Sequence, residues 1–367
     1  MDSESQVKNT GLRGVTVADS AISFIDGDKG VLIYRGYRIE DLADQSSFME
    51  TAYLLLNGVL PVTDEIEAFS RQVKAARELP GFVIDAMKGF PAGAKPMDVL
   101  QAVVPMLAME QDYDDMLERE LYIARAINLI AKMPTITAAW HRLRNGLAPL
   151  LPDASLGHAA NFLWMLKGEK PDTATARDLD ICLVLHADHT FNASTFAARE
   201  VVSTKAPICA GVAAGLGALS GSLHGGANAR VMQMLVELEQ VEDVEGWVIE
   251  RIANGRKIMG FGHAIYKTGD PRAAYLRQMG RRLGEQTGQR WFELSRRIEE
   301  ATLAEFARRG KTTILPNVDY MSAPVYYMMG IPMDIMTPVF AIARVAGWCS
   351  HIIEELFADA QDKPALY

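Results

Sequence analysis

The sequence predicts a mainly α-helical protein with one small β-hairpin near its N-terminus. Two observations support this fold class. An alternating strand pattern occurs only within residues 21–37, and nearly all later segments place apolar residues at helical spacing between cap and stop residues. The chain has 367 residues, 49% hydrophobic and 23% charged. This composition is typical of a globular protein, and the length allows about two domains.

The hairpin is expected where two short apolar segments, 21–25 and Val31–Tyr34, flank the sequence Asp-Gly-Asp-Lys-Gly at 26–30. Glycine and aspartate between two apolar runs are typical of a hairpin loop. No other strand-rich region or internal repeat follows, so β-structure is expected only at this end of the chain.

The helices begin after the hairpin. Ser47 and Glu50 have the spacing of a capping box, and Gly58 is typical of a helix end. Thr63 is expected to cap a second helix that runs toward Pro80. The apolar spacing predicts further helices at 97–110, 118–146, 155–167, 175–188, 193–204, 207–220, 227–239, 244–254, 271–286, 290–309, 320–329 and 336–358.

Residues 211–219 are rich in glycine and alanine at helical spacing. Small side chains let two helix axes approach closely, so a helix buried against other helices is expected. A phosphate-binding loop of the dinucleotide type is the alternative. It is disfavoured because no β-branched strand leads into the glycines and Ser220 stands at the position of the last one.

The net charge of −9 argues against non-specific binding of nucleic acid or of an anionic membrane. Residues 251–311 depart from this balance, with eleven Arg and three Lys against six acidic residues, a net charge of +8. Such a stretch forms either solvated helix faces or a binding site for a small anionic ligand.

The protein is expected to be cytoplasmic. The first residues are acidic and lack the apolar core of a signal segment. Cys182, Cys209 and Cys349 are an odd, widely spaced set, which favours reduced thiols in a reducing compartment. The most apolar stretch, 206–223, contains four glycines, a proline and serines, so no membrane-spanning helix is expected.

Two histidines lie in settings that favour chemistry. His224 is followed by two glycines and then a helix-forming run, which places its ring beside a helix N-terminus, where the helix dipole favours the neutral form. A neutral imidazole can donate a hydrogen bond to a carbonyl oxygen that gains charge. His263 lies in a glycine-rich, irregular segment with Lys267 and Arg272, in the most basic region, where an anion is expected to bind.

Asp319 and Arg344 are the other candidates. Asp319 lies among Val318, Tyr320 and Met321, and a partly desolvated carboxylate is a stronger base, although Asp is also a favoured helix N-cap. Arg344 is a single cation in an apolar helix without a nearby acid in the sequence, so a substrate carboxylate is the expected partner.

A metal site is not expected. Cys182, His186 and His189 would share one face of a helix, but the sequence shows no fourth ligand and no zinc motif. Histidines that serve as satisfied polar groups between packed helices are the other interpretation of this pattern.

Four segments together resemble the citrate synthase family, in its shorter bacterial and archaeal form. They are Leu-His-Ala-Asp-His at 185–189, Leu-His-Gly-Gly-Ala-Asn at 223–228, Gly-Phe-Gly-His at 260–263 with Asp-Pro-Arg at 270–272, and Pro-Asn-Val-Asp at 316–319. The resemblance covers essentially the whole chain. It implies a homodimer, each subunit having a large helical domain, 1–225 and 330–367, and a small domain, 226–329, that closes over the substrate.

The resemblance also implies an activity, the condensation of oxaloacetate with acetyl-CoA to citrate and free CoA, with acetyl-CoA as a substrate and without a metal or other cofactor. Asp319 would remove a methyl proton from the thioester, His224 would hydrogen-bond the thioester oxygen, and His263 would protonate the oxaloacetate ketone. His189, Arg272 and Arg344 would hold oxaloacetate. The residues expected to contact CoA are Lys257, Met259, Gly260, Phe261, Gly262, Lys311 and Asn317.

The sequence departs from the family pattern in two places. Ala264 stands where many relatives carry arginine, which is expected to weaken CoA binding. Relatives also carry a longer C-terminal tail with an arginine that reaches the citrate of the partner subunit. The sequence stops at Tyr367 without that arginine, and we expect the missing tail to lie beyond this point.

Two rival functions stay open at this stage. A 2-methylcitrate synthase would use propionyl-CoA with the same catalytic residues, and one methyl group in a pocket changes the binding free energy by only about 1–3 kcal/mol. A non-catalytic paralogue would keep the fold, but the presence of His224, His263 and Asp319 argues against it.

Overall fold

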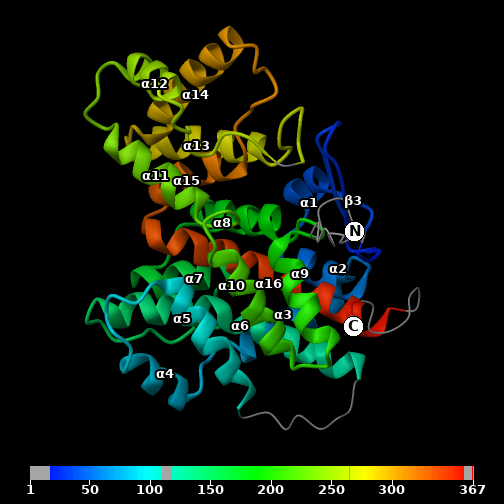
Figure 1. The fold of residues 1–367 in the computed structure, drawn as a ribbon. Coiled ribbons are helices and arrows are strands. Elements are labelled where there is room, and N and C mark those ends of the chain that lie inside the picture. The colour runs from blue at the N-terminus through cyan, green and yellow to red at the C-terminus, as the bar shows by residue number, and fades with distance from the viewer. Residues whose placement is uncertain (1–16, 110–117, 264, 359–365, 367) are drawn as a thin grey trace, which may run out of the picture.

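The structure, a computed structural model, describes residues 17–109, 118–263, 265–358 and 366. Figure 1 shows a large body of helices and, at one end of it, a smaller group formed by α11–α15. We call this group the α11–α15 lobe. The predicted fold class, mainly helical with a small N-terminal β element, is confirmed. Both departures from the family pattern, Ala264 and the C-terminal end, fall outside the described residues.

The N-terminal sheet has three short antiparallel strands in the order β1-β2-β3. They are β1 (Ser23–Asp26), β2 (Val31–Tyr34) and β3 (Tyr37–Arg38). In the predicted hairpin, Ser23 pairs with Tyr34 and Asp26 with Val31, one residue later than the first strand was expected to end. Leu32 and Tyr34 on alternate positions of β2 are fully buried, which fixes the sheet against the helical body.

The helices of the body surround one long central helix, α16 (Met336–Phe357), which packs against α6, α9, α2, α10 and α8. The other helical elements of the body are α1 (Ile39–Gln45), α2 (Phe48–Asn57), α3 (Thr63–Ala75), α4 (Gly81–Lys88), α5 (Pro96–Val103), the 3₁₀ turn η1 (Val104–Ala108), α6 (Arg119–Arg144), α7 (His158–Lys167), α8 (Thr173–His186), α9 (Ala193–Ser203), α10 (Ile208–Ser220) and the 3₁₀ turn η2 (Met333–Ile335).

The α11–α15 lobe packs around α15 (Val318–Met328), which contacts α13 and α11. Its other helices are α11 (Ala227–Glu237), α12 (Val244–Ala253), α13 (Ala273–Thr287) and α14 (Trp291–Arg308). The chain enters the lobe after His224 and leaves it before η2. The exact boundaries of a small domain at 226–329 stay a prediction.

The capping box of α2 is present as expected: Ser47 Oγ accepts from Glu50 N, and Glu50 Oε2 accepts from Ser47 N at 2.7 Å. The prediction for α3 was wrong in two respects. Thr63 is the first helical residue, and Val62 occupies the N-cap position. The backbone N–H of Val62 donates to Glu65 Oε2 at 2.9 Å. The helix also ends early, at Ala75, because its last buried residue is Val73 and the chain then turns toward Pro80.

Two short helices, α1 and α4, were not predicted. Each has only seven or eight residues, too few to show the helical repeat of apolar positions clearly. Burial of a few side chains holds them in place, Leu42 in α1 and Met87 in α4 among them. Tertiary packing therefore determines these elements more than their own sequence does.

The expectation of a close-packed helix at 211–219 is confirmed. A Cβ placed on Gly211 would lie 2.6 Å from Val202 Cγ1 of α9, and one on Gly215 would lie 3.1 Å from the ring of Trp348 in α16. The first distance is shorter than real side chains allow and the second is tighter than most, so small residues let α10 pack closely against these helices. The same packing explains the apolar run at 206–223, most of which lies in α10 inside the protein.

By length and composition alone, the segment Met333–Phe357 could cross a membrane. However, 94% of its most apolar window is buried inside the protein. This is the behaviour of a core helix, since α16 contacts helices on several sides.

Candidate active site

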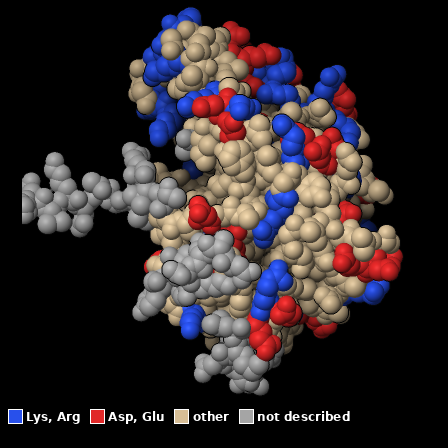
Figure 2. Space-filling view, turned by 90° about the vertical axis from the view of Figure 1, so that its right-hand side faces the viewer, with Lys and Arg blue, Asp and Glu red and all other residues tan. Residues whose placement is uncertain are grey.

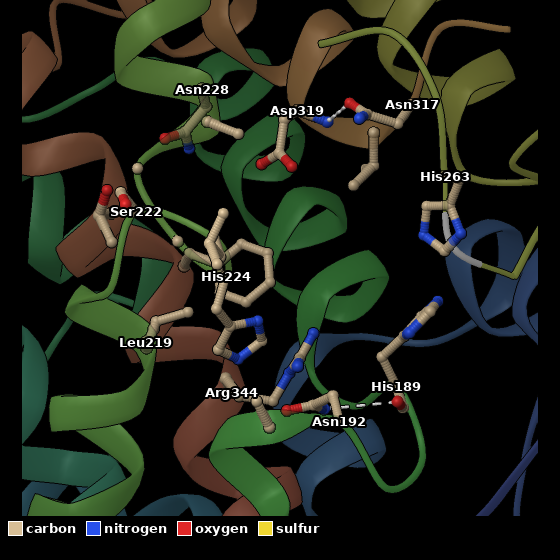
Figure 3. A pocket seen from close by; sticks show the side chains of 18 of the residues that line it. His189, Asn192, Leu219, Ser222, His224, Asn228, His263, Asn317, Asp319 and Arg344 are labelled. Carbon is tan, nitrogen blue, oxygen red and sulfur yellow. Dashed lines mark hydrogen bonds between the residues drawn. The ribbon is translucent and has the colours of Figure 1, made fainter. Parts of the chain in front are cut away.

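A cavity of about 430 Å³ lies where α9, α10, α15 and α16 meet the loops before α9, α11 and α13. Figure 3 shows that the labelled side chains point into this cavity from segments far apart in the sequence. Of the residues proposed from the sequence, the following line it: His189, His224, Gly262, His263, Arg272, Asn317, Asp319 and Arg344. The structure thus brings all six catalytic and oxaloacetate-binding candidates together.

The two glycines after His224 explain its position. A Cβ on Gly225 would lie 1.9 Å from Leu219 O, and Gly226, the N-cap of α11, has a left-handed backbone with φ of 71°. The chain can therefore fold back tightly from α10 into α11, leaving His224 at the cavity wall. Burial, with a smaller contribution from Arg344, lowers the pKa of His224 to about 4, so its ring is neutral near pH 7.

Ser194, at the start of α9, holds the other side of the His224 ring. Its hydroxyl oxygen lies 2.8 Å from His224 Nε2 and accepts from Trp348 Nε1 at 3.1 Å. The single hydroxyl hydrogen has two acceptors within reach, His224 Nε2 and Asn192 Oδ1 at 2.7 Å. Asn192 Oδ1 already accepts the backbone N–H groups of Ser194 and Thr195 as the cap of α9. Asn192 Oδ1 therefore keeps hydrogen-bond donors when the Ser194 hydroxyl donates to another acceptor.

His263 is oriented by its own loop. The backbone N–H groups of Ile265 and Tyr266 donate to His263 Nδ1 at 3.0 and 3.1 Å. Because both donors are backbone groups, Nδ1 must be the acceptor, and the hydrogen of the neutral ring lies on Nε2. Burial, followed by the charge of Arg272, lowers the pKa of His263 and so favours this neutral form.

Asp319 lies in the first turn of α15 but does not cap it. Asn317 is the cap, its Oδ1 accepting from Asp319 N at 3.1 Å and from Tyr320 N at 3.2 Å. The carboxylate of Asp319 is therefore free to point into the cavity (Figure 3). Of the two interpretations open from the sequence, capping is the one that the structure contradicts.

Desolvation decides the protonation of Asp319. Burial raises its pKa from the usual 3.8 to about 6, although Arg272, Arg230 and Arg344 act in the opposite direction. A carboxylate with a pKa of about 6 is largely ionised at neutral pH and is more basic than an exposed aspartate. This combination suits a general base.

Arg344 is 2% exposed and has no carboxylate within ion-pair distance among the described residues. Its Nε donates to His186 O at 2.9 Å, and its guanidinium lies over the ring of Phe340, 4.6 Å from the centroid. Burial lowers the pKa of Arg344 to about 10, which leaves it charged at neutral pH. That a substrate carboxylate is the partner of Arg344 stays a prediction.

Arg272 differs from Arg344 because the protein supplies its partner. Its Nε donates to Asp270 Oδ1 at 2.8 Å and its Nη2 to Asp270 Oδ2 at 2.7 Å, a bidentate pair that is almost fully buried. Burial opposes the charge of Arg272, but Asp270 outweighs this and raises its pKa. The pair orients the guanidinium at the cavity and does not occupy Nη1. Among the described residues, Nη1 donates one long hydrogen bond, to Leu185 O at 3.4 Å.

His189 follows α8 rather than lying within it. The helix ends at His186, and the proposed face of Cys182, His186 and His189 on one helix was wrong. Thr190 has a left-handed backbone with φ of 51°, which turns the chain and brings His189 to the cavity. Its Nε2 is buried without a hydrogen-bond partner among the described residues. Burial, then Arg272 and Arg344, lowers its pKa well below the usual value.

No group of three or more His, Cys, Asp or Glu side chains within the described ranges is arranged to hold a metal ion. His186 instead hydrogen-bonds Cys182 O through Nδ1 at 2.7 Å, and burial lowers its pKa to about 3. The three cysteines are free and buried.

The residues expected to contact CoA are only partly at this cavity. Gly262 and Asn317 line it, whereas Lys257, Met259, Gly260, Phe261 and Lys311 do not. The two segments that carry most of them lie side by side, with Phe261 paired to Pro316 and Asn317 Nδ2 donating to Gly262 O at 3.0 Å. A Cβ on Gly260 would lie 2.7 Å from Tyr320 Cβ, so glycine is needed for this approach.

The basic stretch 251–311 is not a uniform positive surface. Figure 2 shows basic and acidic side chains next to one another at the end of the molecule formed by the lobe. Several of its arginines pair with acids of the same region at 2.6–3.0 Å: Arg277 with Glu299, Arg281 with Glu285, Arg296 with Glu293 and Arg309 with Glu305. Lys257 and Lys311 are exposed and form no ion pair with the described residues, so they remain available to an anion.

Three further residues of the site were not singled out from the sequence. Ser194 and Asn192 contact His224 and its support, and Asp270 pairs with Arg272. Only Asp270 had a signal, since it precedes Arg272 in the Asp-Pro-Arg motif. Ser194 lies 30 positions from His224, and nothing in its local sequence reveals the contact.

Comparison with known proteins gives a consistent result. The family described as citrate synthase, C-terminal domain, matches residues 11–364. The citrate synthase of Haloferax volcanii is 44% identical over 351 residues, which cover 94% of this chain and 91% of that protein. A 2-methylcitrate synthase of Mycobacterium tuberculosis is 39% identical over 366 residues, covering 99% and 91%.

A solved structure agrees with these relatives. The citrate synthase of Thermoplasma acidophilum, in a ternary complex with carboxymethyl coenzyme A and oxaloacetate, superposes with a TM-score of 0.89 at 32% identity. The match covers 96% of this chain and 94% of that one. The resemblance found from the four sequence motifs is confirmed. The chain therefore belongs to the citrate synthase family of enzymes.

Proposed function

We propose that the protein condenses the methyl carbon of acetyl-CoA with the ketone of oxaloacetate and then hydrolyses the citryl thioester, giving citrate and CoA. One observation carries this proposal. A carboxylate with a raised pKa, Asp319, faces the same cavity as two neutral histidines, His224 and His263. A base and two hydrogen-bond donors are what an enolisation followed by attack on a ketone requires.

The first step is proton removal from the thioester methyl group. Asp319 takes the proton while His224 donates a hydrogen bond to the thioester oxygen, on which negative charge develops. For this the ring hydrogen of His224 must lie on Nδ1, and Nε2 must accept the hydroxyl hydrogen of Ser194 Oγ, 2.8 Å away, in place of Asn192 Oδ1. A positioned base contributes about 10²–10⁴-fold and one oxyanion donor about 10²–10³-fold.

The second step forms the carbon–carbon bond. The enol carbon attacks the carbonyl carbon of oxaloacetate, and the ketone oxygen takes the proton from His263 Nε2, the nitrogen that carries the hydrogen in this structure. A water molecule then cleaves the thioester of citryl-CoA, releasing CoA as the thiol and leaving the third carboxylate of citrate. The reaction thus consists of proton transfers, formation of one carbon–carbon bond and hydrolysis of one thioester, and the proposal includes no metal or other cofactor.

Oxaloacetate binds through its two carboxylates. Arg344 provides an unpaired guanidinium, and Arg272, held by Asp270, provides its remaining donor. His189 Nε2, buried and without a partner among the described residues, is a further polar contact. Bidentate guanidinium groups suit a planar dicarboxylate better than lysines do.

The CoA part of the thioester extends from the cavity along the paired segments 257–262 and 311–317. The exposed ammonium groups of Lys257 and Lys311 contact its phosphates, and the backbone of Met259, Gly260 and Phe261 approaches it closely. In this proposal the α11–α15 lobe is the small domain that closes over both substrates, and closure excludes water from the enolised thioester. The subunits act as homodimers in the cytoplasm.

The test is release of CoA thiol by the purified protein with oxaloacetate and either acetyl-CoA or propionyl-CoA. We expect release that depends on oxaloacetate, with a higher kcat/KM for acetyl-CoA. A clear preference for propionyl-CoA would instead assign the protein as a 2-methylcitrate synthase, the name carried by one of its relatives. Absence of thiol release with both thioesters would refute the proposed activity and favour a non-catalytic paralogue.

A further inference from the structure

The turn of the N-terminal hairpin lies against the loop that carries His263. Lys267 N donates to Gly27 O at 3.0 Å, and Lys267 Nζ lies 2.8 Å from Asp28 Oδ1. The turn and the loop are far apart in the sequence, and in Figure 1 the hairpin lies next to the segment that precedes α13. The sheet thus reaches from the body of the molecule to the loop that supplies His263.

The contact at Gly27 is too close for any side chain. A Cβ on Gly27 would lie 2.3 Å from Ile265 O and 2.8 Å from Ile265 C. Gly27 does not have a left-handed backbone, so positive φ is not the reason for glycine there. The close contact with Ile265 is. Because the atoms in the way belong to the backbone of Ile265, a side chain at position 27 must shift the loop and the hairpin turn apart.

The same loop orients His263. Ile265 N and Tyr266 N donate to His263 Nδ1, so the position of Ile265 determines the direction of the opposite nitrogen, Nε2. The ring of Tyr266, 5% exposed, lies 4.7 Å from the ring of His263 and 5.7 Å from that of His189, measured between centroids. Movement of Ile265 is therefore transmitted to His263 within two residues.

We propose that Gly27 is a positioning residue for His263, and that the hairpin turn holds the 263–267 loop where Nε2–H faces the ketone of the bound substrate. This inference rests on the proposed function. It makes the small β element a part of the active site, although it contributes no side chain to the cavity.

The proposal predicts an effect on one step. Displacing His263 affects proton delivery to the ketone, whereas proton removal from the thioester depends on Asp319 and His224, which lie on other segments. A misplacement of about 1 Å can lower the rate of a positioned reaction about 10²-fold. We therefore expect Gly27→Ala to lower kcat for condensation by about 10- to 100-fold.

The experiment compares two reactions of the full chain. The first is thiol release from acetyl-CoA with oxaloacetate. The second is exchange of the acetyl-CoA methyl hydrogens with D₂O, with malate, which has a hydroxyl in place of the ketone, bound in the position of oxaloacetate. For Gly27→Ala we expect slow condensation and an exchange rate within about threefold of the unchanged protein, since a positioned group acts only on its own step.

Two control variants sharpen the comparison. Gly81, the first residue of α4, has no atom within 4 Å of a Cβ placed on it, so Gly81→Ala is expected to leave both reactions unchanged. Asp28→Ala removes the ion pair with Lys267, in which the Lys267 and Asp28 side chains are 70% and 73% exposed, but keeps the backbone hydrogen bond from Lys267 N to Gly27 O. Exposed pairs contribute little, so this variant is also expected to condense normally.

The outcomes separate the possibilities. If Gly27→Ala condenses as fast as Gly81→Ala, the inference is wrong and the proposed function stands. If folded Gly27→Ala loses exchange as strongly as condensation, the turn supports the whole site rather than His263, which also contradicts the inference. If the unchanged protein releases no thiol, the proposed function itself fails.

A second variant covers the case in which Gly27→Ala does not fold. A Cβ on Gly30 would lie 3.0 Å from Gly269 O, so a side chain there presses on the same loop more gently. Gly30 has φ of 64°, which asparagine tolerates better than other side chains do. Gly30→Asn is expected to show the same split, slower condensation with normal exchange, and equal loss of both reactions would contradict the inference.

Discussion

Two buried arginines, Arg199 of α9 and Arg344 of α16, are in opposite electrostatic situations. Arg199 is fully buried, and Glu354 and Glu355 both lie 2.7 Å from its terminal nitrogens. Arg344 is 2% exposed, and no carboxylate of the described chain lies within ion-pair distance of it. Arg199 belongs to a closed cluster in the core, whereas Arg344 faces the cavity with Asp319.

The cluster around Arg199 is connected throughout. His351 Nδ1 lies 3.3 Å from Arg199 Nη1, and His351 Nε2 lies 3.3 Å from the carboxylate of Asp188. Glu354 Oε1 also accepts from Ala21 N at 2.8 Å, which ties the segment before β1 to α16. In this cluster the protein itself supplies carboxylates to the buried cation of Arg199, so its role is to hold elements together.

The cavity keeps some of its polar groups without a partner. Among the described residues, Arg344 has no carboxylate within ion-pair distance, and His189 Nε2 has no hydrogen-bond partner. Arg272 lines the same cavity but is paired with Asp270. Because burying a charge without a partner is unfavourable, the comparison of Arg199 with Arg344 teaches that Arg344 is open to an anion that the described residues do not supply.

The largest effect is expected for Asp319→Asn, which removes the base and keeps the shape. We expect kcat to fall by about 10²–10⁴-fold, while the affinity for oxaloacetate stays nearly unchanged. Steady-state kinetics and oxaloacetate binding by calorimetry measure the two quantities. An active Asn variant would refute the role of Asp319 as the base.

The paired cluster is tested by Arg199→Met. Removing the cation leaves Glu354 and Glu355 buried together, which is expected to lower the free energy of unfolding by about 3–5 kcal/mol while kcat of the folded protein is unchanged. Denaturant titration measures the loss. Adding Glu355→Leu to this variant restores part of the stability if unpaired charge is the cause. A loss of kcat without loss of stability would contradict the assignment.

Arg344→Gln should show the reverse pattern. Hydrogen bonds to charged groups contribute about 1.5–3 kcal/mol, so KM for oxaloacetate is expected to rise by about 10- to 150-fold. The free energy of unfolding should stay the same or increase, because a buried charge without a carboxylate partner has been removed. Arg344→Lys keeps the charge but lacks the planar guanidinium, so its KM for oxaloacetate is expected to lie between those of the unchanged protein and of Arg344→Gln. A stability loss like that of Arg199→Met would show a structural role instead.

The smallest effect is the pH dependence set by Asp319. With a pKa of about 6, the base is protonated in acid, so kcat is expected to fall about tenfold between pH 7 and pH 5. His224, with a pKa of about 4, stays neutral over this range. Rates measured in buffers of constant ionic strength test this, and a profile that is flat down to pH 5 would contradict it.

The contribution of Asp319 to the free energy of unfolding should decrease as the pH rises, whereas kcat increases. The pKa of Asp319 is higher in the folded protein than the usual 3.8, so folding favours the protonated form. The contribution of this group is fully present below pH 4 and is lost as the pH rises through about 6. Asp319→Asn should therefore be more stable than the unchanged protein above pH 7, and the two should become equal near pH 4.

Much of the site was predictable because its residues lie in short, unusual segments. The sequence shows glycines beside His224 and His263, and it shows an acid among apolar residues at Asp319. It does not show which distant residues hold these side chains in place. Ser194 reaches His224 from the start of α9, and Gly27 reaches Ile265 from the hairpin, and in both cases the contact joins segments whose local sequence is ordinary.

The sequence by itself predicted the helical class and the N-terminal hairpin, because local spacing and composition encode them, and four of its motifs carry the resemblance to the family. It also offered as candidates the six side chains that meet at the cavity. Only the tertiary structure decided that Arg272 is paired while Arg344 has no carboxylate partner among the described residues, that Asn317 rather than Asp319 caps α15, and that Gly27 contacts Ile265 in the loop that carries His263. Pairing, desolvation and close approach depend on which distant segments meet, and no local pattern in the chain specifies that.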